Sequence, residues 1–367
     1  MSSNQIGQRI NGNRIANALP GRNRRSAHAR FDSVRWSLLL IALVVASCSN
    51  VAPAGSSRSS QSPSATTATA SPTATGCRLP LWLYDRSTNI GTANFLQLPG
   101  SVLVAAQPSV TSHNVLAAFV PVVNRWVPVA RSLVAPDGSY YAYNETSGSP
   151  EIDRLHVVDM ATSADHVIAQ GSVDTGYEAF DVEADGIYAG RAPNGPATLP
   201  GLWRLDPKTG AATRLDATQR WQWISGGYAF ATVPNSSDPV VVQGGPLPDT
   251  LLRLDLRTGA VQEWFRKRGV FPNVIGFDWN GRPLVILGQT VGELAVVTGA
   301  SSVQPIAGGT PDVTFSQVIP SLVAFSDGFW FTADQGLFSY SGNVGFKKLW
   351  SNPSPGGLYV TLAGPCG

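Results

Sequence analysis

Short apolar runs alternate with clusters of polar turn residues along most of the chain. The runs are rich in Val, Ile, Leu and aromatic residues, and Gly, Pro, Asn and Asp separate them. From residue 77 onward, no long segment repeats its apolar residues at the three-to-four-residue spacing of an amphipathic helix. This is the pattern of short β-strands joined by tight turns. We therefore expect residues 77–367 to fold as an all-β domain.

One strand pattern recurs within that region. It consists of Leu, two variable residues, an apolar residue and Asp, and the clear copies are followed by a Thr-Gly or similar hairpin turn, as at Thr209-Gly210 and Thr258-Gly259. Clear copies begin at Leu81, Leu155, Leu202 and Leu251, and weaker copies at Leu116, Leu294 and Leu337. Internal repetition at such a period indicates an architecture built from repeated units.

A second series of tight turns interleaves with these strands. Residue pairs that accept positive backbone angles favour hairpins, and they occur at Pro99-Gly100, Asp137-Gly138, Asp185-Gly186, Gly226-Gly227, Asn280-Gly281, Asp327-Gly328 and Gly356-Gly357. Each period thus holds two hairpins, or four strands, which is the content of a β-propeller blade. The seven copies of the strand pattern and the seven tight turns favour seven blades. Because the copy at Leu116 is poor, six blades is the alternative.

The segment Ala135-Pro-Asp-Gly-Ser-Tyr-Tyr-Ala-Tyr143, followed by the strand at residues 155–159, is similar to TolB-like and WD-repeat-like β-propellers. The resemblance covers most of residues 80–365 and implies an architecture rather than a chemistry. In such families, strands from the two chain ends complete one blade and remove free sheet edges. Residues 81–85, read as an outer-type strand, and residues 358–363, read as an inner-type strand, are the two ends here.

Two cysteines, Cys77 and Cys366, stand immediately outside those terminal strands. We expect them to form a disulfide that locks the ring, which an oxidising compartment would permit. Two free thiols are the alternative.

The first 47 residues have the pattern of an export signal. Seven arginines precede an apolar run at 36–46, which has the length of a signal-peptide core and is shorter than the ~20 residues that span a bilayer. The run ends in Val45-Ala46-Ser47-Cys48, which resembles the bacterial lipobox. The resemblance implies that the Cys48 thiol receives a diacylglyceryl group and that cleavage removes residues 1–47. A plain signal peptide or a short membrane anchor is the alternative.

Residues 48–76 are the lipidated Cys followed almost entirely by Ser, Thr, Ala, Pro and Gly, a composition that cannot bury enough apolar surface to fold. We interpret them as a tether with an end-to-end distance of roughly 30 Å. The whole chain has 26 basic and 24 acidic residues, and loss of seven Arg and one Asp with the signal leaves a net charge of −4. We therefore expect no nucleic-acid partner. The predicted location is the outer face of the cytoplasmic membrane, or the outer membrane where a cell has one.

The sequence offers few catalytic signatures. It contains no Gly-x-Ser-x-Gly elbow, no Ser-x-x-Lys pair and no Gly-rich phosphate loop. The three histidines of the predicted domain are not spaced as metal ligands, and His156 stands at a strand position of the repeat; they are His113, His156 and His166.

Two cofactor motifs are matched only in part. Asp181-x-Glu183-x-Asp185 resembles the start of a calcium loop, but Ala192 stands where the loop needs Glu. Asp255-x-x-Thr-Gly with Trp264 resembles a quinoprotein blade motif, but the Trp comes one residue late. We predict no catalytic residue, no metal site and no cofactor.

Trp82, Trp203 and Trp330 lie on repeat strands, where we expect them to pack between blades. The less repetitive segments 191–200 and 233–250 are better candidates for a site, because function on a rigid scaffold usually lies on its loops. A neutral surface insertion is the alternative.

These features favour a lipid-anchored, extracytoplasmic β-propeller that serves as a binding or scaffold module for a protein, peptide or glycan. The alternative is a propeller enzyme, either a lactonase or a glycan hydrolase or lyase, with its site in the central funnel. Three or more acids or histidines converging at the axis would favour the enzyme.

Overall fold

The structure is a computed structural model of the chain, and it describes residues 76–148, 151–172, 175–191, 201–219, 221–242, 245–288, 293–306, 321–342 and 344–367. The predicted signal peptide 1–47, the predicted lipidation site Cys48 and the predicted tether, except its residue Gly76, lie outside the described residues. So do residues 192–200 of the first candidate loop.

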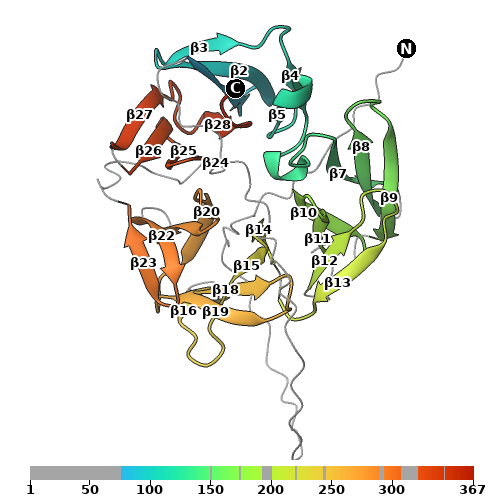
Figure 1. Cartoon of the computed structure of the whole chain (residues 1–367), viewed down its shortest axis with the longest axis vertical. Coiled ribbons are helices and arrows are strands. Elements are labelled where there is room, and N and C mark those ends of the chain that lie inside the picture. Colours follow the sequence, from blue (N-terminus) through green and yellow to red (C-terminus); the bar gives the residue numbers. More distant parts are fainter. Residues whose placement is uncertain are drawn as a thin grey trace, which may run out of the picture. The chain divides into compact units, whose positions relative to one another are not determined.

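Six small sheets form a ring, and each sheet is one blade (Figure 1). Blade 1 has the order β28 (Leu358–Leu362), β1 (Cys77–Asp85), β2 (Ile90–Leu98) and β3 (Val102–Ala105), with β4 (Thr111–Ser112) also paired to β2. Blade 2 contains β7 (Tyr140–Ser147), β8 (Ile152–Asp159) and β9 (Asp165–Ser172) as its second, third and fourth strands, and the isolated bridge of Val134 to Tyr141 stands in place of its first strand. Blade 3 contains β10 (Tyr177–Glu183), β11 (Gly186–Arg191), β12 (Leu202–Leu205) and β13 (Ala212–Asp216).

The remaining blades repeat the antiparallel four-stranded order. Blade 4 contains β14 (Trp223–Ser225), β15 (Tyr228–Val233), β18 (Thr250–Asp255) and β19 (Val261–Arg266), with the hairpin β16 (Val241–Val242) and β17 (Gly245–Pro246) inserted between β15 and β18. Blade 5 contains β20 (Pro272–Phe277), β21 (Pro283–Leu287), β22 (Glu293–Gly299) and β23 (Ser302–Pro305). Blade 6 contains β24 (Leu322–Phe325), β25 (Gly328–Ala333), β26 (Gly336–Ser341) and β27 (Gly345–Ser351).

The blade count is six, the smaller of the two counts that the sequence allowed. The expected seventh unit at Leu116 is instead a two-stranded hairpin of β5 (Ala118–Val120) and β6 (Arg125–Val127), with the short 3-10 helix η1 (Pro121–Val123) at its tip and η2 (Arg131–Leu133) after it. Its two faces pack on different blades. Phe119 joins the aromatic cluster of blade 1, and Ala118 and Val127 join the cluster of blade 2. The hairpin therefore acts as a wedge between these blades.

The chain ends share blade 1, which confirms the expected circular closure. β28 pairs antiparallel with β1, and the register places Leu81 opposite Leu362 and Asp85 opposite Leu358. Beyond the paired strands, Cys77 and Cys366 lie at disulfide distance, with their Cα atoms 5.6 Å apart. This separation is within the range that a disulfide requires.

The strand at Leu81 was read as an outer-type strand, and this assignment needs correction. β28 is the innermost strand of blade 1, so β1 is the second, next to the innermost. The reading failed because Asp85 accepts the backbone N–H of Ser87 (2.7 Å) in a turn like those that follow the third strands of other blades. The same kind of turn, closed by an Asp carboxylate, therefore occurs here between the second and third strands.

The ring has two unlike faces, which we name by their connections. Turns joining the first strand of a blade to the second, and the third to the fourth, form the short-turn face, as at Asp137-Gly138 and Asp206–Gly210. Connections from the second strand to the third, and from one blade to the next, form the long-connection face, which carries the hairpin β16–β17.

Cys77 belongs to the short-turn face. The Asn352 side-chain amide donates to the backbone oxygens of Asp334 and Leu358, both at 3.0 Å, and Asp334 stands in the β25–β26 connection on the long-connection face. β28 therefore starts near that face and runs away from it. Because β1 runs antiparallel to β28, its first residue, Cys77, lies at the opposite, short-turn end.

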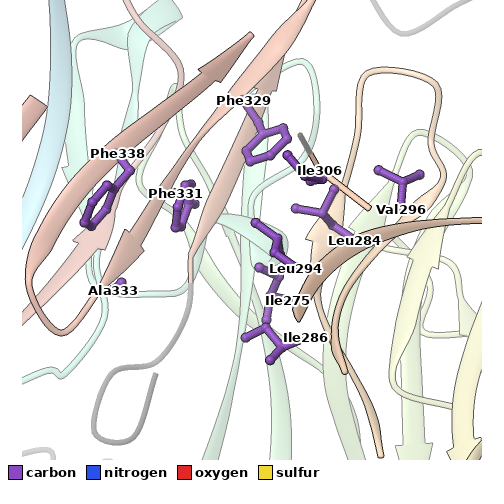
Figure 2. Packing of buried hydrophobic residues seen from close by; sticks show 10 residues of the cluster. All are labelled: Ile275, Leu284, Ile286, Leu294, Val296, Ile306, Phe329, Phe331, Ala333 and Phe338. Atoms are coloured by element: carbon purple, nitrogen blue, oxygen red, sulfur yellow. The ribbon is translucent and has the colours of Figure 1, made fainter. Parts of the chain in front are cut away.

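The core is a set of apolar clusters between neighbouring blades. Figure 2 shows the cluster that joins blades 5 and 6, in which Phe329 and Phe331 of β25 face Leu284, Ile286 and other aliphatic residues. Trp203 and Trp330 are buried in clusters between two blades, as expected, whereas Trp82 is buried between blade 1 and the wedge. Among the described residues, no helix has the length and hydropathy to cross a membrane.

Candidate functional site

The innermost strands surround the axis of the ring, and β10 differs from the others in charge (Figure 1). It carries three acidic residues, Glu178, Asp181 and Glu183. The strands β14, β20, β24 and β28 carry no charged residue. The charge of the inner strands is therefore concentrated on one side of the axis, on blade 3.

Asp181 owes its position to a β-bulge, because the register of β10 against β11 shifts between Ala179 and Asp181. One carboxylate oxygen accepts the backbone N–H of Val182 (2.9 Å), and the other accepts the backbone N–H of Ile224 on β14 (3.3 Å). The side chain thus links the inner strands of blades 3 and 4. Burial, followed by repulsion from Glu183, raises the pKa of Asp181 well above its usual range.

Arg131 of η2 approaches the same two carboxylates. Its guanidinium donates to the backbone oxygen of Val134 (3.0 Å), and its positive charge opposes the rise in the pKa of both Asp181 and Glu183. Burial and the neighbouring Asp185 nevertheless raise the pKa of Glu183. Burial lowers the pKa of Arg131. We call Arg131, Asp181 and Glu183 the inner acidic cluster.

Side chains of neighbouring elements hold β10, which carries Asp181 and Glu183, through hydrogen bonds to its backbone. The Asn144 side chain of β7 accepts the backbone N–H of Ala179 (2.9 Å) and donates to the backbone oxygen of Tyr177. The Ser132 hydroxyl donates to the backbone oxygen of Phe180 (3.0 Å). β10 is therefore fixed from the blade 2 side by two side chains.

A second candidate lies on the long-connection face, in the segment 233–250. The Asp238 carboxylate accepts hydrogen bonds from Arg266 (3.1 Å) and Arg268 (2.8 Å) at the end of β19. These two guanidinium groups lower the pKa of Asp238, with Arg268 contributing most. At the other end of the segment, the buried Asp249 carboxylate accepts the backbone N–H of Gly269 (3.1 Å). The base of the hairpin β16–β17 is thus held on both sides.

The first strand of this hairpin, β16, presents aliphatic side chains to solvent. Val241 and Val242 of β16 are both exposed, whereas Leu247 behind them is buried. The backbone N–H of Leu247 donates to the oxygen of Val240 (2.7 Å), which closes the hairpin. The sequence identified this segment as the longest loop and did not predict its hairpin.

His156 lies in blade 2 among charged neighbours. Its Nδ1 is 2.9 Å from an Asp165 carboxylate oxygen, its Nε2 is 3.3 Å from a Glu145 oxygen, and its ring stacks on Tyr143 at 4.5 Å. His113 contacts the backbone oxygen of Asn89. Within the described residues, no group of three or more His, Cys, Asp or Glu side chains is arranged to hold a metal ion.

The residues of the two partial cofactor motifs contact separate parts of the domain. Asp181 reaches toward β14, whereas Asp185 accepts a hydrogen bond from Arg204 (2.8 Å) in the turn that follows β10. Trp264 packs under the Arg253 guanidinium, whose central carbon is 3.5 Å from the ring centre. Arg131 and Asn144 are the site residues that the sequence did not reveal. Neither belongs to a motif, and only the fold brings them to β10.

A closed ring of small antiparallel sheets around an axis defines the chain as a β-propeller. No protein-family model matches the chain, and no curated protein matches it.

Several solved structures are similar to part of the chain. TolB from Acinetobacter baumannii is 16% identical with a TM-score of 0.43, covering 74% of this chain and 62% of that one. An acylaminoacyl peptidase from Pyrococcus horikoshii is 12% identical with a TM-score of 0.41, covering 75% and 46%. An oligogalacturonate lyase in complex with manganese is 11% identical with a TM-score of 0.40, covering 70% and 87%. The chain thus spans less than two thirds of the first two proteins, and these likenesses concern the fold alone.

Proposed function

We propose that the chain is exported, lipidated on Cys48 and held outside the cytoplasmic membrane, where its propeller binds a protein or peptide partner on the long-connection face. The lipobox-like residues 45–48 and the tether support the anchor. The binding role is supported above all by the hairpin β16–β17.

This hairpin combines exposed aliphatic side chains with a fixed base. Val241 and Val242 stand in solvent, and the contacts of Asp238 with Arg266 and Arg268 restrain the segment that carries them. An aliphatic patch rimmed by charged groups has the composition of a protein–protein contact. Because the base is already ordered, little conformational entropy is lost on binding.

The position of Cys77, where the predicted tether joins the domain, agrees with this role. Cys77 begins β1 on the short-turn face, so the anchor segment joins the domain opposite the hairpin. The long-connection face is therefore left accessible in an anchored molecule.

The binding role is tested by capture from envelope extract on immobilised protein, with Val241→Asp/Val242→Asp compared against Val344→Asp. Val241 and Val344 are 72% and 73% exposed, but they lie on opposite faces. We expect the hairpin variant to lose a captured partner by about tenfold, as the loss of an apolar contact implies, and Val344→Asp to retain it. Equal capture by both variants would contradict the proposed site.

Lipidation is tested separately by labelling cells with radioactive palmitate. We expect label in the wild-type protein and none in Cys48→Ala. Equal labelling of the two would exclude the anchor.

The inner acidic cluster favours one second candidate, a hydrolase or lyase acting on a lactone or glycan. A carboxyl group whose pKa burial has raised can hold a proton to donate, as a general acid must. Purified protein would be assayed for lactone opening and for release of unsaturated or reducing sugar ends. Activity that Asp181→Asn abolishes, with the fold intact, would favour this candidate over the binding module.

A further inference from the structure

The three most exposed aliphatic side chains at the short-turn face, among the described residues, lie in the sectors around the point where the tether joins the domain. Val102 at the start of β3 is 53% exposed, Val122 at the tip of the wedge is 71% exposed, and Val344 in the β26–β27 turn is 73% exposed. They come from blade 1, the wedge beside it and blade 6. Blade 1 is also the blade in which Cys77 begins β1.

These three sectors are neighbours in the ring. One apolar cluster joins blade 6 to blade 1 through Trp330 and Leu81, and another joins blade 1 to the wedge through Trp82 and Phe119. The wedge tip is fixed at the short-turn face, because Arg125 donates to the Ser163 hydroxyl (2.9 Å) in the β8–β9 turn. The three valines are therefore carried by firmly packed elements.

Basic side chains share this part of the face. Arg78 is exposed at the short-turn end of β1, and Lys347 and Lys348 are exposed as the third and fourth residues of β27, counted from its short-turn end. Within the described residues of blades 1 and 6, Asp327 is the one acidic residue on this face. The sectors nearest the tether thus combine exposed aliphatic tips with an excess of positive charge.

We propose that the short-turn face of blades 1 and 6 and the wedge rests on an anionic lipid surface. The valine tips would enter the headgroup region and the basic side chains would pair with lipid phosphates, as in interfacial membrane contacts. The proposal rests on the lipid anchor proposed above. A single lipid-linked segment of 28 residues restrains the domain only to within roughly 30 Å of the surface, and this face is the one nearest to its attachment.

The consequence is a fixed orientation. The two acyl chains of a diacylglyceryl group hold the domain at the membrane, and a contact of apolar and basic groups on the domain restricts how it can turn on its tether. The contact turns the short-turn face to the lipid and the hairpin β16–β17 away from it. The partner site proposed above then faces outward.

The test uses residues 76–367 without the anchor. This segment contains the closing pair β1–β28 and the buried residues of every core cluster, from Leu79 to Ala363, so it is expected to fold alone. Its sedimentation with vesicles of phosphatidylglycerol and phosphatidylcholine is compared with sedimentation with pure phosphatidylcholine vesicles. We expect binding to the anionic vesicles that weakens as salt is raised.

Matched variants locate the contact. Val122→Asp and Val344→Asp should each weaken vesicle binding by about tenfold, through lost apolar insertion and added negative charge. Lys347→Glu/Lys348→Glu should weaken binding to anionic vesicles by at least as much. Val241→Asp, which has the same exposure on the opposite face, should leave it unchanged.

Two results would overturn the inference. One is no binding to anionic vesicles by the folded domain, and the other is equal weakening by Val241→Asp and Val344→Asp. Palmitate labelling of Cys48 would stand in either case, so the failure of this contact is distinguishable from failure of the anchor.

Discussion

The two faces of the propeller follow different rules. On the short-turn face, Asp159, Asp206 and Asp255 each accept backbone N–H groups two and three residues ahead, at 2.7 to 3.0 Å. On the long-connection face, the link between the second and third strands ranges from the two residues Asp334–Gln335 to the segment 234–249, which contains a hairpin. On the short-turn face, three blades repeat the same turn, whereas the connections on the long-connection face differ in length and structure.

The difference shows where backbone geometry selects residues and where it does not. A tight turn closed by one carboxylate admits few side chains, so its sequence recurs from blade to blade. A longer connection has no such constraint, and it is free to acquire contacts of its own, as Asp238 does with Arg268. The repeated face supports the fold, and the variable face is where we place the partner.

The ring closure on the short-turn face should be the largest single contribution to stability. We expect Cys366→Ser to lower the free energy of unfolding by up to about 5–6 kcal/mol, the chain-entropy value for a loop of this length, with a sequence separation of 289 residues. Denaturant titration of variant and wild type measures it. An unchanged midpoint, with two titratable thiols in the wild type, would exclude the disulfide.

Equivalent glycines in two short turns should differ in their tolerance to substitution. Gly210 and Gly259 have φ of +70° and +74°, but a Cβ on Gly210 would collide with the backbone oxygen of Ile168, whereas nothing lies near Gly259. Gly259→Ala should cost about 1–2 kcal/mol for the left-handed backbone. Gly210→Ala should cost a further 1–3 kcal/mol, roughly, for the clash. Equal costs in denaturant unfolding would contradict this packing.

The carboxyl of Asp181 should make stability fall as pH rises. Its pKa in the folded state is raised above the ordinary value of 3.8, so its contribution is present below that value and is lost as pH increases through the raised pKa. Asp181→Asn lacks this titration. The difference in melting temperature, wild type minus variant, should therefore decrease from acidic to neutral pH. A difference that increases would contradict the raised pKa.

The turn carboxylates should show the opposite and smaller dependence. Hydrogen bonds from Thr258 and Arg257 lower the pKa of Asp255, so its contribution is present above 3.8 and is lost as pH falls through the lowered pKa. Asp255→Asn should melt below the wild type at neutral pH, and the gap should narrow in acid. A gap independent of pH would show that this charge has no role in the turn.

The sequence predicted the repeated parts of the fold and missed the parts made by long-range contacts. The strands at Leu155, Leu202 and Leu251 are third strands of blades, and the closure by residues 358–362 is confirmed. Leu116 matched the pattern weakly and lies outside the strands. Asp85 matched the pattern well but lies in the connection from the second strand to the third. A five-residue pattern identifies a turn but does not show which two strands of the blade the turn joins.

The site was harder to predict for the same reason. Asp181 and Glu183 were noted only as part of a calcium-like spacing, and Arg131, some fifty residues earlier, carries no signal in the sequence. Their proximity depends on the stacking of blades 2 and 3. The hairpin segment 233–250 was found because its length breaks the repeat.

The pairing of β28 with β1 also sets the order of assembly. The innermost strand of blade 1 consists of residues 358–362, so that blade cannot be complete until these residues have been synthesised. Until then, one edge of β1 has no partner strand and the ring of blades is not closed. Removal of residues 358–367 would therefore affect the blade that contains β1.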